Sequence, residues 1–404
     1  MSEKKNVPKL RFPEFTEPWE QRKVTDLGEI YIGLVTTMTE HYTDQGHLLI
    51  RNSDIKDGYF EFGENPIYLD EEFSEQNKSR MHQLGDVITV HTGDIGTSAV
   101  IGDNEVNSIG FATIVTRPNQ EVLDSEYFAT YLNTDTHKQW AISMATGDGR
   151  SNYNLKDYTK LVVPIPQIKE QKKIAACIGN LNNLITLHQR KLDHVKDLKK
   201  SMLQKMFPKN GQLYPEVRFP EFTDAWEQRK LGDVFKEYTE KNHIELPTLT
   251  IIQGGGTVKR EDSNRSLMYD QTNLANYKMV RKDDFIVHLR SFEGGLEKSS
   301  LDGIISPAYH TFHSDSADSR FYYPYFRSHE FIKHKLVPHV YGIRDGRSID
   351  IDGMKTIDIP YTSLDEQHAI GDYLEQFDTL ITLHQRELDH LKLLKKGMLQ
   401  QMFV

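Results

Sequence analysis

The sequence predicts an α+β fold in which two α/β domains form a pseudo-two-fold repeat and are separated by two long antiparallel coiled-coil helices. Two repeated phrases lead to this prediction. The phrase "RFPEFTEPWEQRK" (residues 11–23) returns with two changes as "RFPEFTDAWEQRK" (218–230). The phrase "LITLHQRKLDHVKDLKKSMLQKMF" (184–207) returns as "LITLHQRELDHLKLLKKGMLQQMF" (380–403). The copies lie 207 and 196 residues apart, far more than the roughly 20–50 residues of a solenoid repeat, so one large unit is duplicated once.

Length and composition narrow the class of protein. A chain of 404 residues predicts two or three domains at about 150 residues each. The single cysteine, Cys177, excludes an internal disulfide framework and favours a reducing cytoplasm. We find no run of 18 apolar residues and no signal-peptide core, and we therefore expect a soluble cytoplasmic protein. The net charge of −10 argues against a nucleic-acid partner, but phosphates respond to local patches of charge rather than to the total.

The first long helix is expected over 167–207, after the strand "KLVVPIP" and before Pro208. Apolar positions recur there at spacings of three and four, as in a coiled coil, and the second helix, expected over 364–404, repeats them. Such a narrow apolar stripe needs a partner, and the equivalent stripe of the other helix can supply it. Because a globular segment follows the first helix and precedes the second, we predict that the two helices pack on each other antiparallel. The stripe of the first helix comprises Ile174, Ile178, Leu181, Ile185, His188, Leu192, Val195, Leu198, Met202 and Met206. The stripe of the second helix comprises Ile370, Leu374, Phe377, Ile381, His384, Leu388, Leu391, Leu394, Met398 and Met402.

Two features of these helices carry alternatives. His188 and His384 are expected to be packed histidines, because no further cluster of Cys, His or Asp accompanies them, and we predict no metal site. The first helix carries nine basic and three acidic residues, and the second carries four and seven. Opposite signs would favour association, although two solvated faces explain the charges equally well.

The remaining blocks, 1–166 and 218–363, are joined through the first helix and a linker at 208–217. In the first block, "GDVITVHTGDIGTSAVI" (85–101) predicts strand, loop and strand, and "DSEYFATYLNT" (124–134) predicts a helix. Their counterparts in the second block are "KDDFIVHLRSFEGGL" (282–296) and "SRFYYPYFRSHEFIKHKL" (319–336). The blocks have diverged far more than the helices, so they are expected to do one kind of job on two different targets.

Motifs of catalysis are missing. The sequence has no phosphate-binding Gly-x-x-x-x-Gly-Lys loop, no His-Glu-x-x-His, no paired Cys-x-x-Cys and no Gly-x-Ser-x-Gly. The glycines of "IIQGGGTVKR" (251–260) lack the spacing of a nucleotide cradle, and we interpret this stretch as a flexible loop. We assign no catalytic residue.

The repeated phrases, together with the helix starts "PIPQIKEQKKI" (164–174) and "DIPYTSLDEQHAI" (358–370), resemble the specificity (S) subunit of type I restriction–modification enzymes. The stretches "LLIRNSDIKDGYF" (48–60) and 85–101 are also similar to that family's recognition domains. The second block lacks a clear "SDIKDG" element, so positions equivalent to it cannot be assigned there.

The resemblance implies two target-recognition domains, each reading one half of a bipartite, asymmetric DNA site. It implies that the helices fix the spacer and dock two methyltransferase (M) subunits, with restriction/motor (R) subunits in the full complex. It implies a non-catalytic subunit of a DNA adenine methyltransferase and ATP-dependent endonuclease. This chain would have no cofactor of its own, and S-adenosylmethionine, ATP and Mg would belong to the partner subunits.

Base edges must be read by donors and acceptors on loops or strands that enter a groove. The loop "GDGRSNYN" (147–154) is the strongest candidate, although its "DGRS" is repeated at 345–348 and a conserved turn shape explains that repetition equally well. Trp19 and Trp226 stand in both copies, which predicts core packing rather than base stacking. The candidates in the first block are Arg51, Asn52, Thr92, Thr97, Ser98, Arg150, Ser151, Asn152, Tyr153 and Asn154. The candidates in the second block are Lys259, Arg260, Arg290, Ser291, Arg344, Arg347 and Ser348.

Two rival functions stay open at this point. The chain could be a coiled-coil scaffold with two protein-binding heads and no DNA, which the acidic net charge favours. It could also be an enzyme whose site forms between the heads. Steep weakening of binding with salt would mark a DNA reader, because phosphate contacts release counterions.

Overall fold

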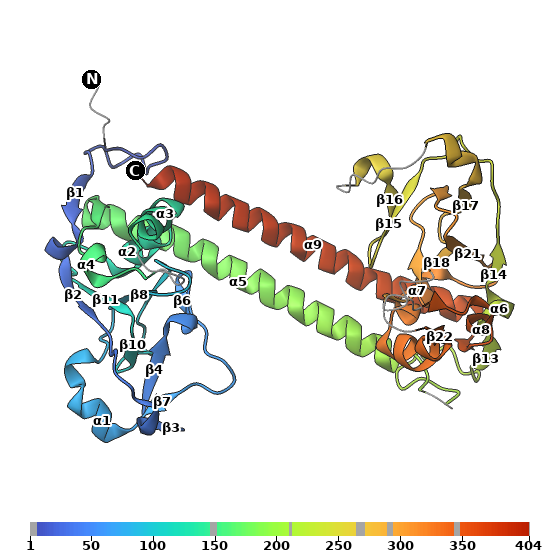
Figure 1. Ribbon diagram of the computed structural model, residues 1–404, viewed down its shortest axis with the longest axis horizontal. Helices are drawn as coiled ribbons and strands as arrows, with labels where there is room; N and C mark the ends of the chain where they lie inside the picture. The colour runs from blue at the N-terminus through green and yellow to red at the C-terminus, as the bar shows by residue number, and fades with distance from the viewer. Residues whose placement is uncertain are drawn as a thin grey trace. The chain divides into compact units, whose positions relative to one another are not determined.

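The computed structural model describes residues 6–145, 152–209, 212–263, 271–288, 294–342 and 348–403. The chain divides into two compact units. Unit 1 comprises Met1–His188 and Glu387–Val404, and unit 2 comprises Gln189–Arg386. Each unit contains one globular α/β domain and part of both long helices, α5 (Ile168–Lys205) and α9 (Leu364–Met402) (Figure 1). The predicted duplication of an α+β fold around two long helices is therefore confirmed.

The domain of unit 1 is built on two four-stranded sheets. One is antiparallel with the strand order β2-β11-β8-β9, and the other has the order β10-β4-β7-β3 with β10 and β4 parallel. The predicted strand, loop and strand of residues 85–101 correspond to β8 and β9. The strands are β1 (Glu20–Lys23), β2 (Gly28–Ile32), β3 (Tyr42–Thr43), β4 (His47–Arg51), β5 (Ile55–Lys56), β6 (Tyr59–Phe60), β7 (Tyr68–Leu69), β8 (Val87–Thr89), β9 (Ser98–Val100), β10 (Ile109–Phe111), β11 (Ile114–Pro118) and β12 (Val162–Ile165). The short helices are α1 (Glu71–Gln76), α2 (Ser125–Leu132), α3 (Asp135–Met144) and α4 (Leu155–Tyr158).

The domain of unit 2 repeats one of these sheets in the same order. Its antiparallel sheet β14-β21-β18-β19 corresponds to β2-β11-β8-β9, and smaller two-stranded pairings surround it. The strands are β13 (Glu227–Lys230), β14 (Lys236–Tyr238), β15 (Leu249–Ile252), β16 (Gly256–Lys259), β17 (Lys278–Val280), β18 (Phe285–His288), β19 (Glu297–Lys298), β20 (Gly303–Ile305), β21 (Tyr309–His313), β22 (Val340–Tyr341), β23 (Ser348–Ile349) and β24 (Asp358–Tyr361). The short helices are α6 (Leu231–Val234), α7 (Ser319–Phe326) and α8 (Ile351–Lys355).

The glycines of "IIQGGGTVKR" form a hairpin, so the interpretation as a flexible loop is wrong. Strands β15 and β16 pair antiparallel, with Leu249 opposite Lys259. Gly254 and Gly256 have φ angles of +79° and +69°, which L-residues with a side chain rarely adopt. A Cβ on Gly256 would also lie 2.9 Å from the carbonyl oxygen of Lys298. The glycines therefore specify a tight turn between two strands.

Within each unit the first repeated phrase binds the start of a long helix. In unit 1, Arg11 of the first phrase donates to both carboxylate oxygens of Glu170, at 2.7 and 2.9 Å. In unit 2, Arg218 makes the same pair with Glu366, at 2.7 and 2.8 Å. Both glutamates are buried. We call each pair an arginine–glutamate latch, and this latch explains why a phrase near residue 11 and one near residue 170 are duplicated together.

The glutamine that follows each latch glutamate ties the long helix to its domain. Gln171 accepts a hydrogen bond from the backbone N–H of Asp124 at 2.9 Å, and Gln367 accepts one from Asp318 at 3.0 Å. Asp124 and Asp318 are the N-caps of α2 and α7. Such side-chain capping satisfies backbone donors that a helix start otherwise leaves open. The "EQ" pair is thus part of the frame that positions each domain on its helix.

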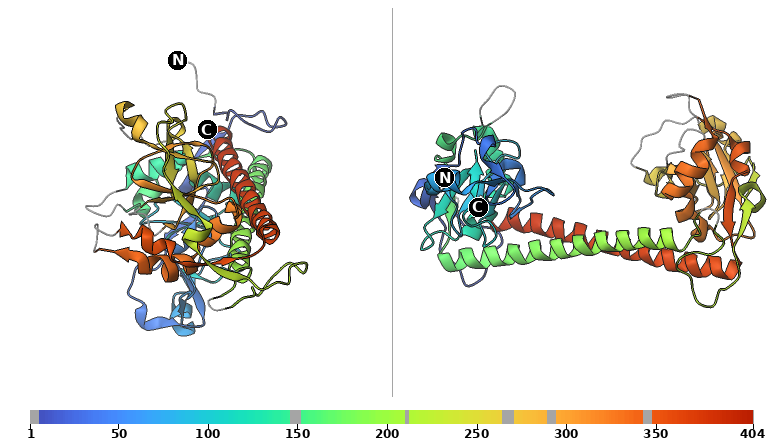
Figure 2. Two further views of the ribbon diagram at one scale, coloured as in Figure 1. Left: turned by 90° about the vertical axis from the view of Figure 1, so that its right-hand side faces the viewer. Right: turned by 90° about the horizontal axis from the view of Figure 1, so that it is seen from below.

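Each domain core is completed by the end of the other copy's helix. In unit 1, Phe403 from the end of α9 packs with Trp19 and Tyr127. In unit 2, Phe207, which follows the end of α5 after Met206, packs with Trp226 and Phe321. Within each unit the start of one long helix therefore meets the end of the other, so the helices run antiparallel, as predicted, and lie side by side (Figure 2). The core positions of both tryptophans confirm that they pack rather than stack on bases.

One turn of the predicted apolar stripe is displaced. Leu198 and Leu394 are 37% and 43% exposed. If the alternation of four and three residues continues beyond Val195 and Leu391, the next packed positions are Lys199 and Lys395 rather than the two leucines. Lys199 pairs with Asp378 and Lys395 with Asp57, so their aliphatic stems are covered while their charges are neutralised. Most of the other predicted packing positions are buried, namely Ile174, Ile178, Leu181, Leu192, Ile370, Leu374, Phe377 and Leu388, and Ile185 and Ile381 are half-buried.

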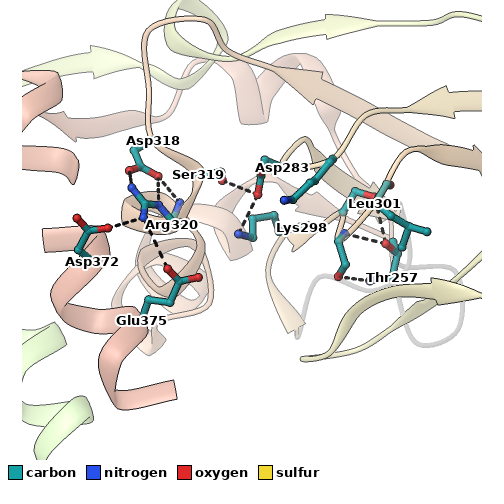
Figure 3. A network of polar contacts seen from close by, with 12 residues as sticks. Thr257, Asp283, Lys298, Leu301, Asp318, Ser319, Arg320, Asp372 and Glu375 are labelled. Atoms are coloured by element: carbon teal, nitrogen blue, oxygen red, sulfur yellow. Dashed lines mark hydrogen bonds and ion pairs between the residues drawn. The ribbon is translucent and has the colours of Figure 1, made fainter. Parts of the chain in front are cut away.

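Unit 2 has an additional ionic connection between domain and helix (Figure 3). Arg320 on α7 donates to the α7 N-cap Asp318 at 2.7 Å and pairs with Asp372 and Glu375 on α9. Hydrogen bonding to Asp318 raises the pKa of Arg320, so this guanidinium stays charged. The corresponding positions of α5 are Ala176 and Gly179, so unit 1 has no such acidic partners there. Arg320 therefore adds an ionic contact between the domain of unit 2 and α9.

Candidate nucleic-acid interface

A hydrogen-bond network in unit 1 joins three segments that are far apart in the sequence. The Asn52 side chain donates to the carbonyl of Ala112 and accepts from the backbone N–H of His91. His91 Nδ1 contacts the Thr92 hydroxyl at 2.8 Å, and that hydroxyl donates to Asn152 Oδ1 at 2.7 Å. Three predicted candidates, Asn52, Thr92 and Asn152, thus converge, and all three are half-buried rather than enclosed.

His91 is a member of this network that sequence reasoning missed. Burial lowers the pKa of His91, so the imidazole is neutral at neutral pH. The Thr92 hydroxyl gives its single proton to Asn152, and therefore His91 Nδ1 carries the ring proton. His91 Nε2 is left as a hydrogen-bond acceptor, and no partner for it occurs in the described part of the chain. Adenine N6 and cytosine N4 are donors that such an acceptor can recognise in the major groove.

Arg51 takes part in a local ion pair. Its guanidinium donates to both oxygens of the buried Asp54, at 3.0 and 2.9 Å. This hydrogen bonding raises the pKa of Arg51, and the side chain stays 38% exposed. The pair fixes the turn that begins at Asn52, and one edge of the guanidinium remains available at the surface.

Three predicted DNA contacts are buried, which does not fit direct contact with a base. The hydroxyl of Thr97 donates to Asp94, and that of Ser98 bonds with Thr89 across β8 and β9. The ring of Tyr153 is enclosed by Trp140 and Tyr158. These polar side chains are tolerated inside because partners are supplied there, so we interpret them as supports of the surface. Asn154 is the half-buried N-cap of α4.

The candidates in unit 2 lie on the β15–β16 hairpin and beyond it. Lys259 ends β16 and is exposed, while Arg260 follows and is half-buried. Burial raises the pKa of Tyr309, and the charge of Arg260 opposes that effect, which places Arg260 near this ring. Lys278 donates to the carbonyl of Tyr309 at 2.7 Å. Arg260 and Lys278 are therefore two basic residues that lie near Tyr309 on β21.

The glycine turn of this hairpin is anchored by a buried carboxylate. Glu297 accepts from the backbone N–H of Gly254 at 2.7 Å and from the hydroxyl of Tyr323 at 3.0 Å, and it pairs with Arg327. The hairpin that carries Lys259 and Arg260 is thus held in place on α7. Ser348 lies half-buried in β23. Six candidates lie outside the described residues, namely Arg150, Ser151, Arg290, Ser291, Arg344 and Arg347.

No three His, Cys, Asp or Glu side chains of the described ranges converge as metal ligands would. No helix in these ranges combines the length and the apolar character needed to cross a membrane. The polar network of unit 1 and the β15–β16 hairpin of unit 2, which leads into Lys259 and Arg260, therefore form the candidate interface.

Comparison with known proteins gives matches over nearly the whole chain. A family model described as type I restriction modification DNA specificity domain matches residues 16–197 and again 223–393. A putative type I restriction enzyme MjaX specificity subunit of Methanocaldococcus jannaschii is 24% identical, over 97% of this chain and 94% of that protein. The type I restriction enzyme EcoBI specificity subunit of Escherichia coli is 24% identical over 42% of this chain and 36% of its own length.

Solved structures share the fold. The type I restriction–modification S subunit from M. genitalium superposes with a TM-score of 0.62 at 14% identity, over 98% of this chain and 99% of that one. A chain from a study of complex assembly in the type I system has a TM-score of 0.54 at 17% identity, over 96% and 99% of the two chains. The two-domain architecture with long helices is thus a known one.

Proposed function

Because this chain belongs to the family of type I restriction–modification DNA specificity domains, we propose that it selects the DNA sequence for such an enzyme. Each domain reads one half of a bipartite, asymmetric site. The observation that carries this function is the contrast between frame and surface. The latch pairs Arg11–Glu170 and Arg218–Glu366 are the same in both units, whereas the polar network of unit 1 has no copy among the residues of unit 2 that the structure describes. Two different readers on one repeated frame suit a site with two unlike halves.

The assignment of parts follows the sequence boundaries. Residues 1–166 and 218–363 are the two recognition domains, 208–217 is the linker, and the helices 167–207 and 364–404 are the spacers. A helical spacer fixes the distance between half-sites, because a helix rises about 1.5 Å per residue and does not stretch. The gap in the DNA site is then a geometric property of α5 and α9.

Catalysis belongs to the partner subunits. Methyltransferase subunits supply S-adenosylmethionine chemistry on adenine, and restriction/motor subunits supply cleavage driven by ATP and Mg. The half-buried network around His91 and the basic side chains of the β15–β16 hairpin support the DNA-reading role, because they offer the donors, acceptors and positive charge that grooves and phosphates require. A protein-binding scaffold without DNA would have no use for them.

Salt dependence distinguishes the DNA reader from the scaffold. We expect the affinity of the assembled complex for its DNA site to fall steeply with salt, by about 10³–10⁵ between 50 and 200 mM if roughly 6–10 phosphates are contacted. Fluorescence anisotropy with a labelled duplex measures this directly. If the intact complex does not bind DNA even at low salt, the result favours the scaffold function.

Exposed leucines indicate where the methyltransferase subunits dock. Leu184 and Leu187 on α5 are 43% and 47% exposed, and their repeat counterparts Leu380 and Leu383 on α9 are 43% and 54% exposed. Residues three apart share one helix face, and a helix face directed to water is ordinarily polar. One such leucine pair lies in each unit, which fits two copies of one partner.

We expect Leu184→Ser/Leu187→Ser to weaken docking of one methyltransferase subunit. Full burial of an exposed leucine contributes about 1.5–3 kcal/mol, and these two leucines are already about half-buried, so the double change should raise the Kd of that subunit at least roughly tenfold. Light scattering after size-exclusion chromatography would show the loss of one partner of two. Leu393→Ser is the control, because Leu393 is 69% exposed but its repeat counterpart is Asp197. Equal loss with the control would refute this docking face.

A further inference from the structure

A cavity of about 520 Å³ lies in unit 1 between the domain and the long helices. The β5–β6 turn and the junction of α2 and α3 form its domain side, and one face each of α5 and α9 forms its helical side. Its most numerous charged lining groups are the four lysines Lys138, Lys392, Lys395 and Lys396. Neither the polar network nor the predicted docking leucines belong to it.

The charge of this cavity is positive although the chain as a whole is acidic. Asp57 and Asp135 also line it, so four lysines face two carboxylates. Lys395 pairs with Asp57 at 3.0 Å, and Lys138 lies 4.0 Å from Asp94 outside the cavity. No ion pair of Lys392 or Lys396 occurs among the described residues, and both side chains are exposed.

The lysines stand on one face of α9 at an energetic cost. Lys392 and Lys396 are four residues apart, a spacing at which like charges destabilise a helix. Lys395, beside them, is only 15% exposed and is held by Asp57. The side-chain amides of Asn182 and Asn183 on α5 face the same space and add neutral hydrogen-bond donors. Cations and amide donors that converge in a cavity are the groups that bind phosphate.

We propose that the cavity between Lys138, Lys392, Lys396 and the β5–β6 turn is a phosphate-binding site. Its ligand is a phosphodiester of the DNA backbone or the phosphates of a free nucleotide, because both present the same oxygens. The assignment of the ligand as DNA rests on the proposed function, whereas the assignment of the cavity as a phosphate site does not. In the DNA case the site binds the backbone without reading sequence, since lysine contacts phosphate as a point charge.

The test uses the full chain assembled with its methyltransferase subunits. Lys392→Gln/Lys396→Gln removes the two lysines for which the described part of the chain offers no ion pair. Lys169→Gln/Lys172→Gln is the matched control, because these residues are also exposed lysines of a long helix in unit 1 but do not line the cavity. The slope of log affinity against log salt is measured for a duplex with the recognised sequence and for one with scrambled halves.

For backbone binding we expect the cavity variant to reduce the slope by about 1.8, because each phosphate contact contributes about 0.9. This equals roughly a tenfold smaller loss of affinity over a fourfold rise in salt. Both duplexes should be affected equally, and the control should keep the wild-type slope. Titration of the DNA-free complex with ATP and with inorganic phosphate forms the second arm, and binding lost only in the cavity variant identifies a free nucleotide or phosphate as the ligand.

An unchanged slope together with unchanged ATP and phosphate titrations overturns the phosphate site. That outcome is separable from a failure of the proposed function. If the wild-type complex does not distinguish the recognised duplex from the scrambled one, the reading of DNA sequence fails, while the ATP and phosphate titrations still decide the nature of the cavity.

Discussion

Phe403→Ala is expected to destabilise the domain formed by the opposite end of the chain. Phe403 packs in the core of unit 1, with ring centroids 5.5 Å from Tyr127 and 6.2 Å from Trp19. Truncation of a buried phenylalanine costs about 3–5 kcal/mol. Hydrogen exchange followed by mass spectrometry should show this loss in the amides of β1 and α2, with little change in β13 and α7.

The repeat supplies the reciprocal experiment. Phe207→Ala should expose the amides of β13 and α7 instead, because the ring centroid of Phe207 lies 4.7 Å from that of Phe321 and 5.2 Å from that of Tyr325 in unit 2. Phe403→Leu is the control that keeps most of the apolar volume and should cost far less. A Phe403→Ala protein that loses protection chiefly in residues 218–361 would contradict the exchange of helix ends between the copies.

The second large effect is expected from removing the charge of a latch glutamate. Glu366→Gln leaves the Arg218 guanidinium, which is only 12% exposed, without its carboxylate. Breaking a buried ion pair on one side costs about 3–5 kcal/mol. Glu170→Gln should act in the same way on Arg11, but less strongly. Glu366 also accepts from the Trp226 indole N–H at 3.1 Å, and that hydrogen bond is worth about 1 kcal/mol.

A double variant distinguishes the effect of the unpaired charge from the effect of lost side-chain packing. Arg218→Met/Glu366→Met replaces both charges by apolar side chains, and a buried pair replaced in this way is often neutral in stability. We therefore expect the double variant to be more stable than Glu366→Gln alone. Protection of the unit 2 amides against hydrogen exchange is the readout, because a chain of two units does not unfold in one step. A double variant less stable than the single one would refute an ionic latch.

The long helices could be predicted because their signal is periodic and local. Positions three and four apart identify the packed face of α5 and α9 without knowledge of the partner. The same reasoning misplaced one turn, where Leu198 and Leu394 are exposed. An apolar pattern does not include lysine as a packing residue. Lys199 and Lys395 nevertheless pack their aliphatic stems between the helices, and their ammonium groups form ion pairs with Asp378 and Asp57.

The partners of each helix end could not be predicted. The sequence shows that Phe207 and Phe403 are equivalent, but periodicity specifies a face and not the domain that covers it. The end of α9 packs on the domain at the start of the chain, where Phe403 lies beside Trp19. This contact is visible only in the folded structure. A local sequence pattern cannot predict a contact between residues that are separated by nearly 400 positions.

Residue type alone does not show which candidate residues lie together at the surface and which are buried. Residue type indicated Asn52, Thr92 and Asn152, which the fold brings together. The same criterion selected Thr97 and Ser98, whose hydroxyl groups are satisfied inside the domain, because composition alone does not distinguish a buried hydrogen bond from an exposed one. The cavity lysines were not singled out, since their importance depends on the β5–β6 turn that lies opposite them.

The central claim is that each domain reads one half of a split DNA sequence, and mapping of methylated adenines tests it most directly. The chain is co-expressed with a cognate methyltransferase subunit, and modified adenines are read across the genome. We predict one motif with two short halves and a fixed gap. A chimera that exchanges residues 1–163 for those of a relative with the same latch should change one half only. An assembled complex that methylates no split motif, or a chimera in which both halves change, would contradict the account.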